Sequence, residues 1–339
     1  MRENYPLLDI ARFLAAISII LIHCGRLVEN DFLHFFLKNT FARLAVPLFI
    51  ISSSYFYRKK AMVDTMYPKK YFSRQWKRYV IWSIFYLPYG WYYITSLDLS
   101  IVLYPIAFVI GLCYLGTCYH LWYFPALLFT LSVVSFLKKH ICYCLLVIMS
   151  FLLFFIGASE TYSAYLHGKI SEFYTLFHSI TLTNRNGLLY VLIFVVLGFI
   201  IADFEKTLFL ERYPLTKLAS AFILLIIEWY LVFQNQGDDK NFYFGLLAVA
   251  FFLFCILIKS EKMITKDYVI LRKYSQYLFF LHPLILESIK FFSYYGINKE
   301  IDGLPLFFVT LFVTLSVSWI VLHKDKLLNT FTIIVLKNS

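Results

Sequence analysis

The chain has 339 residues, of which 61% are hydrophobic and 15% charged, and its mean hydropathy is +0.72. A soluble globular domain carries about 25% charged residues, so this composition excludes a large water-soluble core and indicates a polytopic membrane protein. The net charge of +11 would suit nucleic acid, but the basic residues lie in short loops between apolar runs, as membrane topology signals do. We therefore expect no nucleic-acid partner.

Apolar runs of membrane-spanning length recur along the whole chain and predict about ten transmembrane helices in an all-α fold. They fall near residues 7–27, 43–57, 78–94, 121–137, 141–158, 188–204, 216–233, 242–259, 274–293 and 304–322. The first run is too long for a cleavable signal peptide and lacks a small-residue cleavage site. About 17 residues follow the last run, so we expect no further domain there, and we expect residues 1–339 to form one domain.

The loop charges decide the topology and the ambiguous run at 99–117. The loop from Arg58 to Arg78 is strongly basic and should be cytoplasmic, which also places the N-terminus in the cytoplasm. If 99–117 does not span, the later basic loops also fall inside and the acidic loop at 237–239 falls outside. We therefore predict a bacterial inner-membrane protein with both termini cytoplasmic, and a short re-entrant or interfacial helix near 99–117 on the outer face.

The first predicted helix carries Asp9, Arg12 and His23. Arg12 and His23 are 11 positions apart, about three helical turns, so they share one face roughly 16 Å apart along the axis. An arginine inside a membrane helix costs about 2.5–3.5 kcal/mol, so it is normally retained for a partner or a substrate. The alternative is that Arg12 pairs with Asp9 and extends to the interface, with His23 a histidine of the outer boundary.

The other polar residues within the apolar runs fall into an outer layer, an inner layer and an intermediate depth. The outer layer has His23, Arg43, His120, Trp122, Arg185 and Asn186, and the inner layer has Asp9, Arg12, Ser53, Ser54, Arg74, Lys77 and Arg78. Glu228, Ser275, His282 and Glu287 lie between them. Such a polar column indicates a route for a polar molecule.

Several of these residues allow a structural interpretation as well. Arg74, Lys77 and Arg78 recur at helical spacing and suit a polyanion such as phosphate, but they also suit a positive-inside anchor. His282 and Glu228 each fit either a functional role or a hydrogen bond between helices. Trp122 fits sugar stacking or the aromatic belt at the membrane surface. We expect no metal site and no disulfide framework, because the six cysteines form no CxxC pair.

Together these positions resemble the membrane-bound acyltransferase-3 family over essentially the whole chain. The resemblance rests on the arginine and histidine of the first helix, on Arg43-Leu-Ala-Val-Pro-Leu-Phe49, and on the basic start of the third helix. It continues through Tyr119-His-Leu-Trp-Tyr123, Asn184-Arg-Asn-Gly187 with Gly198 downstream, and Tyr277-Leu-Phe-Phe-Leu-His-Pro283. Two departures are Ser53-Ser54, where the family has Ser-Gly, and Arg74-Gln-Trp-Lys-Arg78, where it often has R-x-x-R.

The resemblance implies transfer of an acyl group, usually acetyl, from cytoplasmic acyl-CoA to a hydroxyl of a surface or lipid-linked glycan. In this scheme acetyl-CoA is bound by Arg74, Lys77, Arg78 and Ser53. His23 is the general base, and Arg12 and Asp9 complete the catalytic group. The acceptor is bound by six residues, namely Arg43, His120, Trp122, Arg185, Glu228 and His282. The alternative is a multi-helix transporter of a small polar solute or lipid-linked sugar, although the hydropathy shows no inverted repeat.

Overall fold

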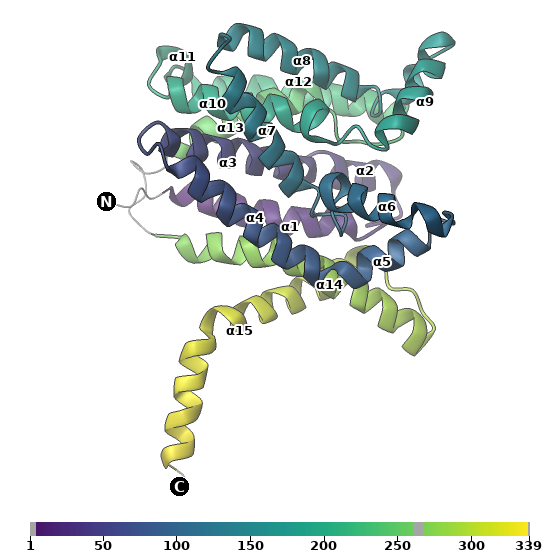
Figure 1. The fold of residues 1–339 in the computed structure, drawn as a ribbon, viewed down its shortest axis with the longest axis vertical. Helices are drawn as coiled ribbons and strands as arrows, with labels where there is room; N and C mark the ends of the chain where they lie inside the picture. The colour runs from purple at the N-terminus through teal and green to yellow at the C-terminus, as the bar shows by residue number, and fades with distance from the viewer. Residues whose placement is uncertain (1–4, 260–266, 338–339) are drawn as a thin grey trace.

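The computed structural model describes residues 5–259 and 267–337, and every regular element in these ranges is a helix. Most of the long helices lie side by side along one direction (Figure 1). The α-helices are α1 (Pro6–His23), α2 (Asp31–Asn39), α3 (Ala45–Ala61), α4 (Tyr67–Phe85), α5 (Leu87–Thr95), α6 (Tyr104–Ile110), α7 (Tyr123–Leu137), α8 (Tyr143–Ala158), α9 (Lys169–Thr181), α10 (Leu192–Phe204), α11 (Leu208–Glu211), α12 (Pro214–Gln234), α13 (Phe244–Ile258), α14 (Val269–Ile297) and α15 (Gly303–Lys337). Short 3₁₀ segments span Ala42–Leu44, Ile101–Leu103 and Ser163–Tyr165, and π-helical turns span Gly111–Leu115 and Gly187–Val191.

Five helical segments in the described ranges are long and apolar enough to cross a membrane. They are Pro6–His23, Asp31–Ala61, Gly187–Phe204, Pro214–Gln234 and Gly303–Lys324. Shorter apolar helices cover Ile101–Leu115, Tyr123–Leu137, Tyr143–Ala158 and Phe244–Ile258. The structure thus supports an all-helical membrane protein with five such segments. The 15 residues from Ile101 to Leu115 include the short helix α6, and as an α-helix they would reach only about 22 Å, less than a bilayer core of about 30 Å.

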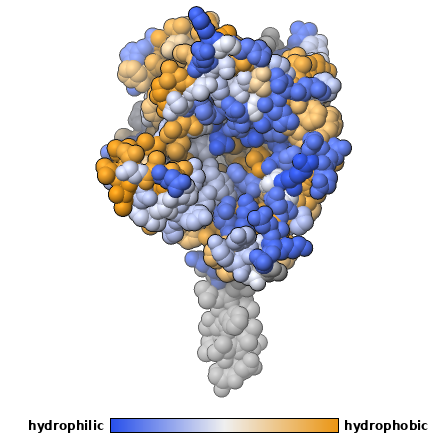
Figure 2. Space-filling model, turned by 90° about the vertical axis from the view of Figure 1, so that its right-hand side faces the viewer, coloured by the Kyte–Doolittle hydropathy of each residue, from blue (hydrophilic) through white to orange (hydrophobic). Residues whose placement is uncertain are grey.

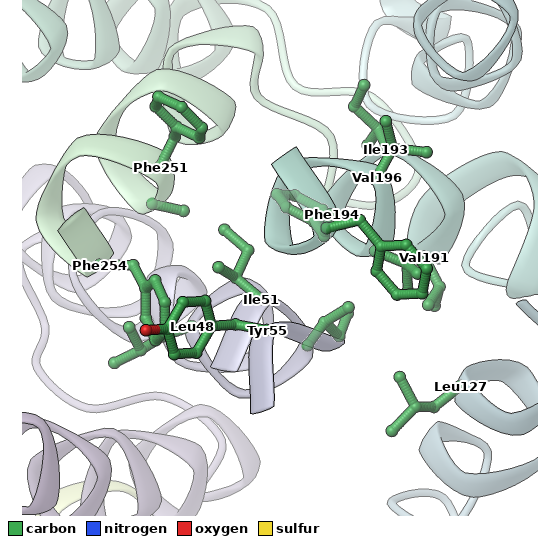
Figure 3. Packing of buried hydrophobic residues seen from close by; sticks show 14 of the residues in the cluster. Leu48, Ile51, Tyr55, Leu127, Val191, Ile193, Phe194, Val196, Phe251 and Phe254 are labelled. Carbon is green, nitrogen blue, oxygen red and sulfur yellow. The ribbon is translucent and has the colours of Figure 1, made fainter. Parts of the chain in front are cut away.

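The helix α3 lies at the centre of the bundle, packed against α1, α10 and α13. Figure 3 shows Leu48, Ile51 and Tyr55 of this helix facing side chains of α10 and α13, among them Phe194 and Phe254. Because lipid is as apolar as these side chains, such contacts hold membrane helices together by close packing more than by the hydrophobic effect. The core therefore fixes the position of α3 beside α1.

The closest approach in this core uses Gly198 of α10. A Cβ atom built on Gly198 would lie 2.0 Å from Ser54 Oγ and 2.8 Å from the Ile51 carbonyl oxygen. The sequence has Ser54 where the family that it resembles has glycine. In this structure the glycine that permits close packing is Gly198 of the partner helix.

The end of the helical bundle and its flanks differ in polarity. Figure 2 views the end of the bundle where α1 terminates, with hydrophilic residues gathered over its middle and hydrophobic residues along its flanks. Large apolar side chains such as Ile223, Ile227 and Leu231 of α12 are exposed. This distribution is the one expected when the flanks of a helical bundle face lipid and its ends face water.

Candidate functional site: an arginine-lined cavity between the helices

A cavity of about 250 Å³ lies between α1, α3, α4, α7 and α14. Its lining contains eight of the residues to which the resemblance assigns a catalytic or binding role, namely Arg12, His23, Ser53, Arg43, Arg78, His120, Trp122 and Arg185. Arg12 and His23 come from the same face of α1, as their spacing predicted. The cavity therefore follows α1 over about three turns, roughly 16 Å.

At one end of the cavity, Asp9 joins two arginines from different helices. Arg272 of α14 donates from Nη2 to Asp9 Oδ2 at 3.0 Å, and its Nε lies 2.9 Å from Oδ1. Arg12 Nη1 lies 3.7 Å from the same carboxylate, whose side chain is only 1% exposed. Arg12 also donates to Ser52 Oγ, and its guanidinium lies 5.2 Å from the Phe56 ring centre. A buried carboxylate bound to two guanidinium groups fixes both arginines where they reach the cavity.

The basic residues of α4 contribute unequally to this end. Tyr71, Gln75 and Arg78 line the cavity, whereas Arg74 and Lys77 do not. Arg74 instead lies near the Tyr71 ring, 5.9 Å from its centre. The face of α4 directed at the cavity is therefore 71, 75 and 78, and Arg78 is the one predicted donor-binding cation of α4 found there.

Ser53 lines the cavity next to Ser52, the residue that accepts from Arg12, and its hydroxyl oxygen is 3.1 Å from Tyr123 Oη. Tyr123 also donates to the Phe49 carbonyl oxygen at 3.3 Å. The hydroxyls of Ser53 and Tyr123, from α3 and α7, thus form a polar pair near the Arg12 end. This pair could hydrogen-bond a polar chain threaded along the cavity.

Near the other end, the ring of His23 meets two aromatic side chains. Its ring centre lies 5.7 Å from that of His282 and 4.4 Å from that of Tyr119. His120 lies 5.7 Å from His282 by the same measure, and neither of its ring nitrogens has a hydrogen-bond partner among the described residues. Three histidines from α1, α14 and the segment before α7 therefore form one cluster. His282 contacts His23 without being part of the cavity lining.

The turn that brings His120 to the cavity depends on a glycine. Gly116 has φ +82°, and a Cβ there would lie 2.5 Å from the Trp122 backbone nitrogen. Only glycine adopts this conformation readily while allowing so close an approach. Gly116 thus closes the chain back on itself and directs the segment from Tyr119 to Tyr123 at the cavity.

Two further arginines lie at the end where α1 terminates. Arg43 donates from Nη1 to Asn241 Oδ1 at 2.5 Å and from Nε to Asn39 Oδ1 at 3.2 Å, and its Nη2 lies 3.8 Å from Asp239 Oδ1. The guanidinium of Arg185 lies 5.1 Å from the Trp122 ring centre. All of Arg43, Asn241, Arg185 and Trp122 line the cavity.

Glu228 lies away from the cavity. Its carboxylate accepts hydrogen bonds at 2.6 Å from the backbone nitrogens of both Phe244 and Gly245, and it also accepts from the Tyr162 hydroxyl. These two amides belong to the first turn of α13, where a negative charge is favourable. Glu228 therefore caps the start of α13, which accounts for a buried glutamate in the bundle. The structure gives no support to acceptor binding by Glu228.

The sequence analysis assigned no site role to Arg272, Gln75, Tyr123 or Asn241, all of which line the cavity. From the sequence, Arg272 belongs to one of the later basic loops, which served only to assign the topology. A signal was present, since Arg272, Ser275, Gln276 and Phe279 recur at helical spacing and all line the cavity from α14. In the described residues, no group of three or more His, Cys, Asp or Glu side chains could hold a metal ion.

The apolar flanks and the polar internal cavity define a helical membrane protein built around one candidate site. Comparison with known families narrows this class, because the profile described as an acyltransferase domain, that of the acyltransferase-3 family, matches residues 5–323. The chain belongs to the acyltransferase-3 family. This confirms the resemblance found in the sequence.

The curated relatives carry other names. A serine/alanine racemase of Enterococcus gallinarum is 28% identical over 84% of this chain and 41% of its own length. Two amino-acid racemases of Enterococcus faecalis are each 26% identical, over 68% and 87% of this chain and 36% and 43% of their own lengths. The chain thus matches about two-fifths of the length of these relatives. No solved structure gives a significant match.

Proposed function

We propose that this protein is a membrane-bound acyltransferase that moves an acyl group, acetyl in the simplest case, from cytoplasmic acyl-CoA to a hydroxyl of a surface or lipid-linked glycan. Membership of the acyltransferase-3 family supports acyl transfer as the reaction. The observation that carries the proposal is one cavity with Arg78 and Arg272 near one end and His23 near the other. Such a cavity can hold donor and acceptor against a shared base.

The proposal includes ten membrane passes, with both termini on the cytoplasmic side of a bacterial inner membrane. It is supported by the basic loops, which all fall on one side when residues 99–117 do not span. Arg12, Arg78 and Arg272 then face the cytoplasm, and His23 and Arg185 face the outside. Acyl-CoA would enter among Arg12, Arg78 and Arg272, and the acceptor glycan would enter near His23 and Arg185.

In the proposed reaction, Arg78 binds phosphate oxygens of CoA, and Arg12 and Arg272 line the path of the pantetheine chain. His23 removes the proton from the acceptor hydroxyl as its oxygen attacks the thioester carbonyl carbon. The C–O bond forms and the C–S bond breaks, and His23 returns the proton to the departing thiolate of CoA. Imidazole suits both steps because one of its ring nitrogens can accept a proton and then donate it.

The acceptor end is built from Arg43, His120, Trp122 and Arg185. A tryptophan face can stack on a sugar ring, while guanidinium and imidazole groups hydrogen-bond its oxygen atoms. The racemase names of the relatives concern proteins of which this chain matches about two-fifths. We therefore base the proposed acceptor on the cavity and the family.

The proposal is tested with the purified full-length protein in a neutral detergent, incubated with acetyl-CoA labelled in the acetyl group and with glycan acceptors. We expect free CoA to appear together with label on the glycan, and a membrane lacking the protein to give neither. Uptake of a solute into vesicles without cleavage of acetyl-CoA would refute the proposal and support the transporter alternative.

A further inference from the structure

The cavity carries an excess of positive charge. Five arginines line it, namely Arg12, Arg43, Arg78, Arg185 and Arg272, and no aspartate or glutamate belongs to the described lining. Asp9 lies beside Arg12 and Arg272, and Asp239 lies 3.8 Å from Arg43. Neither Arg78 nor Arg185 forms an ion pair with a carboxylate of the described residues. Arg78 is exposed and Arg185 half-buried, so both guanidinium groups are open to an anion brought by a substrate.

The donor accounts for only one of these two arginines. Arg78 lies on the same side of the cavity as Arg12 and Arg272, where the proposed function puts CoA phosphates. Arg185 lies at the other end, beside Trp122 and beyond His23. Its charge acts on the Glu160 carboxyl without an ion pair between the two in the described residues, so its hydrogen-bond donors are available to the acceptor.

The backbone around Arg185 is held in place. Asn184 is fully buried and donates from Nδ2 to the Gly157 carbonyl oxygen at 3.0 Å, which ties it to the end of α8. Asn186 accepts from the backbone nitrogens of Leu188 and Leu189 at 3.0 and 2.9 Å, which starts the next helix. Arg185 thus lies between two anchored residues, so that little freedom of its backbone is lost when a ligand binds.

A second polar group at this end also lacks a partner. His120 is 3% exposed and lines the cavity, and neither of its ring nitrogens is hydrogen-bonded within the described residues. A buried imidazole without partners costs free energy unless a ligand supplies them. Arg43, held by Asn39 and Asn241, adds a third group able to bind oxygen atoms.

We propose that the acceptor is anionic and that Arg185 binds its carboxylate or phosphate group while His23 faces the hydroxyl to be acylated. This inference rests on the proposed acyl transfer and adds the charge class of the acceptor to it. A carboxylate on the sugar and a phosphate linking the sugar to its carrier offer the same oxyanion chemistry. Trp122 provides the stacking face next to that charge.

The test measures ligand binding in the purified full-length protein by isothermal titration calorimetry. The probes are methyl glucoside, its C6 carboxylate analogue methyl glucuronoside, and glucose 1-phosphate. We expect at least one anionic probe to bind about ten- to a hundredfold more tightly than methyl glucoside, as for a hydrogen-bonded charge. Preference for the glucuronoside identifies an acidic sugar, preference for the phosphate identifies a phosphate-linked one, and preference for both identifies an unselective oxyanion site.

Substitutions separate the role of Arg185 from a general effect of charge. Arg185→Gln should abolish the preference for the anionic probe. Arg185→Lys keeps the positive charge, so it should retain part of this preference and shows that a substitution at this position leaves the protein folded. Arg212 is the matched control, because its guanidinium also stacks on an aromatic ring, 4.9 Å from the centre of Tyr213, outside the cavity. Arg212→Gln should bind as the unmodified protein does. Equal affinity for neutral and anionic probes, or an unchanged preference in Arg185→Gln, would overturn the inference.

Acetyl-CoA binding is measured separately in the same preparation. If acetyl-CoA neither binds nor is cleaved while the anion preference persists, the proposed function fails and the anion site remains. If acetyl transfer proceeds equally well to neutral and anionic glycosides, the proposed function stands and the anionic acceptor is refuted.

Discussion

The rings of His23 and His282 are stacked, with centres 5.7 Å apart and planes inclined by 22°. His282 Nδ1 lies 2.7 Å from the Leu278 carbonyl oxygen, and a carbonyl can only accept. We therefore assign the proton of His282 to Nδ1, which leaves its buried Nε2 without a hydrogen-bond partner in the described structure. His282 thus packs against the ring of His23, which lines the cavity.

Replacing His23 by alanine should lower acyl transfer roughly a hundredfold or more, because a general base contributes about that much. The rate of CoA release with a glycan acceptor measures the effect. His282→Ala should lower the rate less, since His282 acts through the position of His23. Both variants should insert into membranes as the unmodified protein does. A His23→Ala variant that kept full activity would refute the general-base role.

Replacing Arg78 by glutamine should raise the apparent KM for acetyl-CoA about tenfold, because a charge-assisted hydrogen bond to phosphate is lost. The apparent KM for the acceptor should change little. Lys77→Gln removes an equal charge one position away on α4, but Lys77 does not line the cavity. This control should leave both constants nearly unchanged, and equal effects of the two substitutions would argue for a long-range charge effect instead.

The pair of Asp9 and Arg272 should matter for stability. Arg272→Gln leaves the buried Asp9 with only the more distant Arg12, and we expect a loss of about 3 kcal/mol in the free energy of unfolding. Asp9→Asn should cost a similar amount, and the double variant should cost less than the two losses together. The exposed pair Arg26 and Asp31, 2.7 Å apart, is the control, and Asp31→Asn should change stability by no more than about 1 kcal/mol. Additive losses at Asp9 and Arg272 would contradict the coupling.

The sequence was informative where a property depends on one helix. The spacing of Arg12 and His23 predicted one shared face, and both residues line the cavity. Local charge also predicted the polar end of α4, although only Arg78 of its three cations reaches the cavity. These are short-range features, because helical periodicity determines which residues share a face.

The sequence was less informative where a property depends on how helices pack. His282 was assigned to an intermediate depth, and its contact with His23 arises from the packing of α1 on α14. The same packing brings Arg272 to Asp9, across 263 positions of the chain. Glu228 was predicted either to act on the substrate or to hydrogen-bond a neighbouring helix. Its partners are backbone amides of α13, which no sequence pattern identifies.

Close packing of α3 and α10 predicts a strong effect at Gly198. Gly198→Ala would bring a methyl group to within 2.0 Å of Ser54 Oγ, so the helices must shift, at a cost of about 1–3 kcal/mol. Thermal unfolding in detergent measures this loss. Gly296 is the control, because a Cβ there would meet no atom within 4 Å, and Gly296→Ala should be nearly neutral. Equal stability of the two variants would show that the approach of α3 and α10 is looser than described.

Glu160 should make stability depend on pH. It lies in the turn after α8, where burial and the nearby Asp239 raise the pKa of its carboxyl to about 7, against an ordinary value of 4.5. Between these two values the folded protein holds a proton that the unfolded chain has released, so stability falls as pH rises. The fall is complete above about pH 7 and amounts to about 3 kcal/mol at most.

The unfolding temperature, measured from about pH 5 to about pH 8, tests this sign. We expect it to decrease with rising pH in the unmodified protein and to vary less in Glu160→Gln, which stays neutral throughout. His178 Nδ1 lies 3.7 Å from Glu160 Oε1, so His178→Gln is measured in parallel as a control for the loss of this neighbour. If the slope survives unchanged in Glu160→Gln, Glu160 is not its source.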